Sequence, residues 1–282
     1  MLKETISNDE IKKIFGNADR KKKYLKRLYK ELGVEYKIPS KKEDLDYAII
    51  STWSYETSKT IIRNLYFNSE KYFNAKRGKS RYNNLISQWK KKEFGALEWP
   101  FAANNFDDRV AKLNRENISE SKKDKIITNE VVKFRRIKQI NTLRNDFIEN
   151  LIIENNSSIV PTLVHNKRCD FYIDGVSFDQ KVSRSVGKEF TQKHGNNYRD
   201  FAIDHPDEVA KSLYENQDAA RFGAENRLYV VFLDSEISID KIESKIKEID
   251  FSEPHRFIFE YKDKDGEKRK YSTECFVILL HN

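Results

Sequence analysis

The segment Cys169–Val182 reads CDFYIDGVSFDQKV, and its composition predicts two short strands joined by a tight turn. Asp174–Gly175 is a strong signal for a two-residue hairpin turn. If the turn holds these two residues, Ile173 pairs with Val176 on the neighbouring strand. The segment therefore predicts an antiparallel hairpin with a defined register.

This register sorts the side chains of the hairpin onto two faces, because side chains alternate along a strand. One face looks like core and carries Phe171, Ile173, Val176, Phe178 and Val182. The opposite face carries Asp170, Asp179 and Lys181, with Asp170 opposite Asp179. Like charges roughly 5 Å apart across a sheet destabilise it, so the two carboxylates require compensation.

Two kinds of compensation fit this face. A divalent cation such as Mg²⁺ takes oxygen ligands from one or two carboxylates, and Lys181 would then contact whatever the metal holds. Alternatively, the face is a solvated surface on which Lys181 and Arg168 relieve the two acids. The turn, the apolar opposite face and the position of the lysine together favour the metal site.

The order of Asp170, a short strand pair and Asp179–Gln180–Lys181 resembles the signature of the PD-(D/E)XK nuclease superfamily, which includes many type II restriction endonucleases. The resemblance covers only this hairpin, and Cys169 stands where the superfamily often has proline. It implies an α/β fold of the restriction-endonuclease type, with a central mixed β-sheet flanked by helices. It also implies that the two acids bind Mg²⁺ and that the lysine assists the attacking water or the scissile phosphate.

The resemblance further implies a third acid on a helix that precedes the catalytic strands. A long helix is predicted from about residue 129 to residue 154. Its apolar stripe recurs at three- and four-residue steps, at Ile137, Ile140, Leu143, Phe147 and Leu151. Glu149 flanks this stripe and is the candidate for metal binding and catalysis. Glu154 is the competing acid, and a plain surface glutamate is the remaining alternative.

The composition indicates a highly charged chain with a basic excess. The 282 residues are enough for one large domain or two small ones. Charged residues make up 35% of the chain, and the net charge is +8. Such an excess suits a polyanionic partner such as double-stranded DNA, although lysine-rich chains encoded by AT-rich genomes reach the same balance without one.

The cysteine content and the hydropathy indicate a cytoplasmic setting. Cys169 and Cys275 provide no disulfide framework. The first residues include Lys3 and Glu4 and no apolar run, so no signal peptide is predicted. No stretch approaches the roughly 20 apolar residues of a membrane helix. We therefore expect a cytoplasmic protein without a membrane partner.

The first part of the chain is predicted to be mainly helical, over about residues 8–33 and 42–100. Its basic second helix either reads DNA within a helix-turn-helix or packs by its Leu and Tyr side with solvated lysines. The glycine-containing segment 76–79 is predicted to be a turn. Its basic residues, Lys76, Arg77 and Lys79, are candidate contacts to a DNA backbone.

The polar segment Asn114–Lys125 is predicted to be a linker. It divides the chain into an α-helical region, residues 1–125, that recognises or clamps DNA and an α/β catalytic domain, residues 126–282. Ser183–Asn197 is predicted to be a mobile basic loop beside the catalytic strand. The candidate DNA contacts in this loop are Arg184, Lys188 and Lys193.

The remainder of the chain predicts further strands and helices for the same sheet. A helix is expected from Asp207 to about Arg221, and the apolar run Leu228–Leu233 is typical of a strand buried on both faces. A helix over Ile239–Ile249 and a closing hairpin over 256–280 follow. Strand, helix and strand in this order predict a crossover unit in a mixed sheet.

The sequence thus predicts a Mg²⁺-dependent endonuclease that cleaves double-stranded DNA, most like a type II restriction enzyme. The resemblance adds a homodimer and a cognate DNA methyltransferase acting on the same site as expected partners. Two other hypotheses stand beside it. One is a nuclease of the same fold that acts in repair, transposition or phage processing, and the other is a non-catalytic DNA-binding protein whose acids are structural.

Overall fold

The computed structural model describes residues 6–35, 37–102, 105–164, 169–216, 225–234, 237–262 and 266–282. Arg168, the second basic residue considered beside Asp170 and Asp179, lies outside the described residues. The chain divides into two compact units. Residues 1–72 and 151–282 form the first, termed the sheet unit, and residues 73–150 form the second, termed the helical unit.

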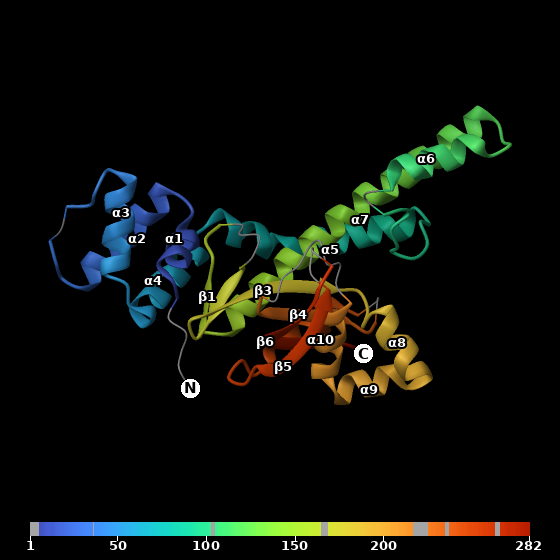
Figure 1. Cartoon of the computed structure of the whole chain (residues 1–282). Coiled ribbons are helices and arrows are strands. Elements are labelled where there is room, and N and C mark those ends of the chain that lie inside the picture. The colour runs from blue at the N-terminus through green and yellow to red at the C-terminus, as the bar shows by residue number, and fades with distance from the viewer. Residues whose placement is uncertain are drawn as a thin grey trace. The chain divides into compact units, whose positions relative to one another are not determined.

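The sheet unit is built on a six-stranded mixed β-sheet (Figure 1). The strands are β1 (Ile159–Pro161), β2 (Phe171–Ile173), β3 (Val176–Ser183), β4 (Arg227–Phe232), β5 (His255–Lys262) and β6 (Lys268–Leu280). Their order across the sheet is β1-β2-β3-β4-β6-β5. The β3–β4 and β4–β6 pairs are parallel, and the other pairs are antiparallel. The predicted mixed sheet flanked by helices is confirmed.

The β2–β3 hairpin forms with the predicted register, in which Ile173 lies opposite Val176. Both turn residues adopt positive φ angles, 49° at Asp174 and 89° at Gly175. A tight two-residue turn needs this left-handed backbone at its centre, and Asp–Gly adopts it at low cost. The local sequence therefore decides the geometry of this hairpin.

Helices connect the parallel strands. Between β3 and β4 lie α8 (Lys188–His194), a 3₁₀ turn (Gly195–Asn197), α9 (Tyr198–Asp204) and α10 (Pro206–Glu215). After β4 comes α11 (Ile239–Lys247). The predicted crossover between the two parallel strands is therefore confirmed.

The prediction of a basic loop over Ser183–Asn197 is wrong, because most of this segment is helical. Phe190 of α8 is 1% exposed and packs against the rings of His194 and Phe201. Phe190 and Val186 thus anchor this largely polar segment on the body of the unit. Burial of such an aromatic ring contributes a few kcal/mol, on the order of 2.

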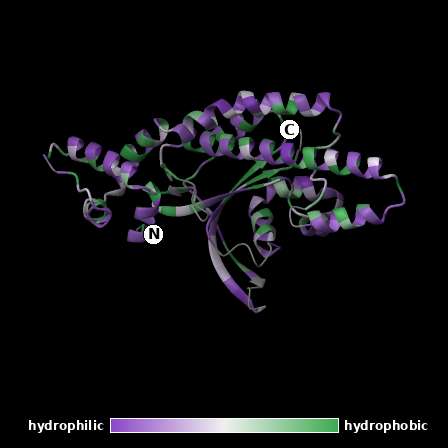
Figure 2. Cartoon of the chain, turned by 90° about the horizontal axis from the view of Figure 1, so that it is seen from above, coloured by the Kyte–Doolittle hydropathy of each residue, from purple (hydrophilic) through white to green (hydrophobic). Residues whose placement is uncertain are grey.

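The buried face of the crossover helices forms one core cluster with the sheet. Its residues are Val186, Phe190, Ala202, Val209, Ala210, Tyr214, Tyr229, Val231, Phe259 and Cys275. Every residue of β4 is buried, as its continuous apolar run predicts. In Figure 2 the helices alternate between hydrophilic and hydrophobic colours, as expected for helices that bury a single stripe.

Four helices precede the sheet and belong to the same unit. They are α1 (Asn8–Phe15), α2 (Ala18–Glu31), α3 (Lys42–Ser51) and α4 (Tyr55–Phe67). A capping box starts α1, because Ser7 and Glu10 each bond the other's backbone N–H. Arg63 of α4 donates to three carbonyl oxygens at the entrance to β1, those of Ile153, Asn156 and Ile159, at 2.7–3.0 Å. These bonds tie the N-terminal helices to the sheet.

The helical unit contains most of α5 (Glu70–Lys91) and α7 (Glu120–Asn155), together with α6 (Phe106–Arg115). The prediction that Asn114–Lys125 is a linker is wrong, because α6 ends and α7 begins within it. The proposed boundary between residues 125 and 126 falls inside α7, so it does not coincide with the division into compact units.

The predicted turn at 76–79 is also wrong, since these residues lie in the middle of α5. Gly78 is buried, and a Cβ atom there would lie 3.6 Å from the carbonyl oxygen of Leu143 and 3.8 Å from Cβ of Phe147. These are ordinary van der Waals distances, so Gly78 lies where α5 packs against α7. Within the described residues, no helix is both long and apolar enough to cross a bilayer.

Candidate functional site

Asp179 and Lys181 lie two residues apart on β3, so their side chains point to the same face. Nζ of Lys181 is 2.5 Å from Oδ2 of Asp179. The Asp179 side chain is 11% exposed and that of Lys181 is 31% exposed. The acid and the base that the sequence singles out therefore form a close and largely shielded ion pair.

Asp170 lies directly before β2 and reaches the middle of β3. Its Oδ2 accepts a hydrogen bond from the backbone N–H of Gln180 at 2.8 Å. Its own N–H donates to the carbonyl oxygen of Phe178 at 2.9 Å. Because Gln180 stands between Asp179 and Lys181, these bonds bring all three predicted residues to one stretch of β3.

The environment of Asp179 disfavours its negative charge. Burial raises the pKa of the Asp179 carboxyl above its ordinary value, and the charges of Lys181 and Arg227 oppose this rise. A carboxylate that is costly to ionise in a shielded site is stabilised by an added cation. An additional cation beside this carboxyl would therefore favour its ionised form.

Arg227 is a further candidate that the sequence did not single out. It starts β4, pairs with Asp179 in the parallel register, and is 2% exposed. Its Nη1 donates to the hydroxyl of Tyr229 at 2.9 Å, and its guanidinium carbon lies 4.6 Å from the ring centroid of Tyr214. Its Nη2 lies 3.8 Å from Oε2 of Glu225. The available signal was a charged residue at the start of an apolar strand.

Three acids and two bases therefore lie around this part of β3, and their formal charges sum to −1. The acids are Asp170, Asp179 and Glu225, and the bases are Lys181 and Arg227. Binding of a divalent cation would leave this cluster with a net positive charge. A positive, shielded cluster attracts a phosphodiester group.

The two helix acids of the sequence analysis lie in different units. Glu149 is on α7 within the helical unit and is 7% exposed, and its role as third acid stays a prediction. Glu154 is on the last turn of α7 within the sheet unit. It is exposed and accepts a hydrogen bond from the hydroxyl of Tyr72 at 2.8 Å. Glu154 therefore has the surroundings of a surface glutamate.

The six basic residues predicted to contact DNA lie on three segments. They are Lys76, Arg77 and Lys79 on α5, Arg184 just after β3, and Lys188 and Lys193 on α8. Lys193 lies 3.7 Å from Glu208 in an exposed ion pair, which contributes little to stability. The α5 residues belong to the helical unit and the others to the sheet unit. Contact of these residues with DNA stays a prediction.

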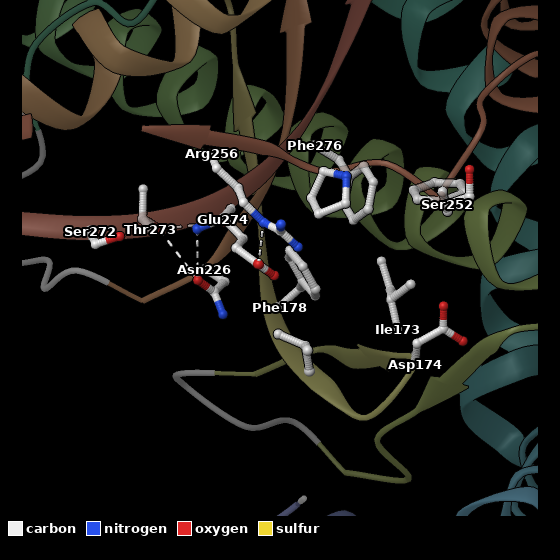
Figure 3. Close-up of a pocket in the computed structure, with 13 residues that line it drawn as sticks. Ile173, Asp174, Phe178, Asn226, Ser252, Arg256, Ser272, Thr273, Glu274 and Phe276 are labelled. Carbon is white, nitrogen blue, oxygen red and sulfur yellow. Dashed lines mark hydrogen bonds and ion pairs between the residues drawn. The ribbon is translucent and has the colours of Figure 1, made fainter. Parts of the chain in front are cut away.

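A cavity of about 430 Å³ lies on the other face of β3 (Figure 3). Phe178 and Phe276 line it together with Arg256, Glu274 and other residues. Nε of Arg256 lies 2.7 Å from Oε1 of Glu274, so the main charges of this cavity neutralise each other. Consecutive strand residues point to opposite faces, so the cavity beside Phe178 does not belong to the Asp179 site.

The carboxylates of Asp170 and Asp179 fit a magnesium ion better than a structural zinc ion. Over the described parts of the chain, no three His, Cys, Asp or Glu side chains are grouped to hold a metal. Magnesium commonly takes only one or two carboxylates, and waters and substrate phosphates complete its shell. Structural zinc sites need four protein ligands.

No protein-family model, curated protein or solved structure matches the chain significantly. The interpretation of the site therefore depends on its own geometry and electrostatics.

Proposed function

We propose that the protein is a Mg²⁺-dependent endonuclease of the restriction-endonuclease fold that cleaves double-stranded DNA. One observation carries the proposal: Asp179 is buried beside the ammonium group of Lys181 in the middle of β3, and Asp170 accepts a hydrogen bond from the backbone N–H of Gln180, which stands between them. A type II restriction enzyme is the simplest case. A homodimer and a cognate DNA methyltransferase belong to the same proposal.

In this proposal Asp170 and Asp179 hold the metal ion through carboxylate oxygens. When bound, Mg²⁺ supplies charge neutralisation at the phosphate and lowers the pKa of a coordinated water. The reaction is an in-line displacement at phosphorus, in which a P–O bond to water forms and the P–O bond to the leaving deoxyribose oxygen breaks.

Lys181 has a second role once Asp179 is otherwise neutralised. Its ammonium group now pairs with Asp179 at 2.5 Å, and its partial exposure leaves it in reach of a substrate. Released from that pair, it donates to a phosphate oxygen and stabilises the charge that develops there. Arg227 is a positioning residue in this scheme, because its buried charge favours the ionised form of Asp179.

The test compares two aspartates of the same hairpin. Asp179→Asn removes the charge with little change of shape, and Asp174→Asn is its matched control, since asparagine also suits the left-handed backbone of this turn. We expect Asp179→Asn to lower Mg²⁺-dependent cleavage of a sequenced phage genome by about 10³-fold, comparable to the loss of one transition-state contact. Asp174→Asn should cleave like the native protein, and both should bind DNA in EDTA.

Thermal unfolding of the same variants gives a second readout. Because burial raises the pKa of Asp179 in the folded state, the contribution of this group to stability is present at low pH and is lost as the pH rises through the folded value. At pH 7 its charge therefore costs stability, so Asp179→Asn should unfold no more easily than the native protein. Cleavage by Asp179→Asn at the native rate, or no native cleavage with Mg²⁺ or Mn²⁺, would overturn the proposal.

A second candidate function is a DNA-binding protein without catalytic activity. The close Asp179–Lys181 pair favours it, because the two charges already neutralise each other without a metal. DNA binding without cleavage, together with marked destabilisation by Asp179→Asn, would support this function. A repair, transposition or phage-processing nuclease of the same fold would instead cut at structured or free DNA ends, which mapping of the cleaved ends detects.

A further inference from the structure

A groove on the N-terminal helices of the sheet unit gathers positive charge. Its volume is about 450 Å³, and nine described residues line it. Five of them are basic residues of α2: Arg20, Lys23, Lys26, Arg27 and Lys30. Asn68 and Ser69, after α4, add neutral polar groups, and Leu65 and Leu163 add apolar surface. None of the nine is acidic, so no lining residue offsets the five positive charges.

The spacing along α2 places most of these cations on one face. Arg20, Lys23, Arg27 and Lys30 follow one another at three- and four-residue steps, so they form a single stripe. Ten residues of helix span about 15 Å. The opposite side of α2 is buried through aromatic and aliphatic residues, namely Tyr24, Leu25, Leu28 and Tyr29. Packing of this buried side leaves the basic stripe facing the groove.

The stripe works against the stability of its own helix. Like charges at three- and four-residue spacing each cost a few tenths of a kcal/mol, on the order of 0.2–0.5. Arg20 also lies in the first turn of α2, where the helix dipole disfavours a cation, whereas Lys30 lies in the last turn, where the dipole favours one. By contrast, the buried Lys21 of the same helix forms an ion pair with Asp46. The chain thus neutralises the buried lysine and leaves the groove cationic.

The basic residues of the stripe repel one another and so lower the stability of α2. Positions where a chain gives up stability in this way are often functional, and a ligand of negative charge would relieve the repulsion. The stripe is longer than a single phosphate group, so an extended polyanion fits it better than an isolated anion. Lysine side chains bind phosphates as mobile point charges, and such contacts fix position without reading sequence.

We propose that the α2 groove binds the phosphodiester backbone of double-stranded DNA, as an anchoring surface separate from the Asp179 site. The proposal rests on the proposed function and adds the residues that hold the substrate. In this proposal α2 contacts phosphates without regard to sequence, and does not read bases as a helix-turn-helix would.

The test is the salt dependence of DNA binding by the full chain. Fluorescence anisotropy with a mixed-sequence duplex is measured in EDTA, so that no cleavage occurs, over a range of KCl concentrations. The triple variant Lys23→Gln, Arg27→Gln, Lys30→Gln removes three charges from the groove. Each lost phosphate contact lowers the slope of log K against log salt by about 0.9, so we expect a decrease of about 2.7.

A matched triple variant controls for net charge. Lys241→Gln, Lys245→Gln, Lys247→Gln removes three charges from α11 of the same unit. It should change the slope by less than a third as much as the groove variant does. Equal changes in both variants, or a native slope in the groove variant, would overturn the proposal. If the triple groove variant fails to fold, Lys23→Glu alone repeats the comparison against Lys241→Glu.

Inorganic tripolyphosphate distinguishes DNA from a small polyanion. Tight tripolyphosphate binding that the groove variant loses while it keeps native DNA affinity would assign the groove to a free oligophosphate and overturn the DNA proposal. Cleavage is scored separately on Asp179→Asn. If the groove proposal is wrong, the groove variant binds DNA like the native protein, while cleavage still depends on Asp179. If the nuclease proposal is wrong, no cleavage depends on Asp179, while DNA binding still depends on the groove. The two failures are therefore distinguishable.

Discussion

The charges around Asp179 and those of the α2 groove are organised in opposite ways. Around Asp179, Lys181 and Arg227 meet acids at 2.5–3.8 Å, and most of these side chains are shielded. The groove instead combines five cations and no acid among its lining residues. Paired, shielded charges act locally and resist salt, whereas exposed charges of one sign act through their summed field and are screened. The two proposals assign cleavage to the first region and binding of a polyanion to the second.

The largest expected effect is the loss of DNA cleavage when Lys181 is replaced. If the cluster performs the chemistry, Lys181→Gln lowers Mg²⁺-dependent cleavage by about 10²–10³-fold, because a donor to the developing charge is lost. DNA affinity in EDTA should stay within about threefold, since one charge near a shielded pair adds little to phosphate binding. Single-turnover cleavage and anisotropy measure the two quantities.

The control for Lys181→Gln is Lys247→Gln on α11, which removes the same charge from an exposed ion pair with Glu243. It should leave the cleavage rate unchanged. An equal loss of cleavage in both variants would mean that only the overall charge matters, and the contrast between the two regions would fail.

A smaller effect is expected on stability, from two arginines. Arg227→Met removes a buried guanidinium group that favours the ionised form of Asp179 and packs over the ring of Tyr214, so we expect a loss of about 2 kcal/mol, within the usual range for a single substitution. Arg27→Met in the groove should change the free energy of unfolding by less than about 0.5 kcal/mol, as for most surface substitutions. Urea denaturation compares the two variants. A similar loss of stability in both variants would show that Arg27 interacts with the folded chain as strongly as Arg227 does.

The part of the fold that the sequence predicts correctly depends on local information. The β2–β3 hairpin follows from Asp174–Gly175 and the alternation beside it, and the buried strand β4 follows from its apolar run. The predictions that fail depend on distant packing. Gly78 reads locally as a turn but lies buried within α5, where the helix packs against α7. Phe190 holds a largely polar segment in α8 by packing against the ring of Phe201.

The candidate site shows the same limit. Asp170, Asp179 and Lys181 were found because one hairpin brings them together. Arg227 was missed because only the parallel pairing of β3 with β4 places it beside Asp179, and no local pattern specifies that register. The groove was missed because basic residues of α2 gain meaning only with Asn68, Ser69 and the apolar residues that enclose them.

The smallest effect tests the groove without any ligand. Lys23→Gln relieves repulsion within the stripe, so at low salt it should raise the free energy of unfolding by about 0.2–0.5 kcal/mol. Lys12→Gln on α1 is the matched control, because Lys12 pairs with Asp9 at 3.1 Å and its loss should lower stability by a similar amount. Both effects should fade in about 1 M salt, where the screening length is about 3 Å. Urea titrations at two salt concentrations measure them. A gain of stability in Lys23→Gln and a loss in Lys12→Gln at low salt would support an unbalanced positive charge in the groove. A loss of stability in both variants would mean that acids elsewhere in the chain already balance the stripe.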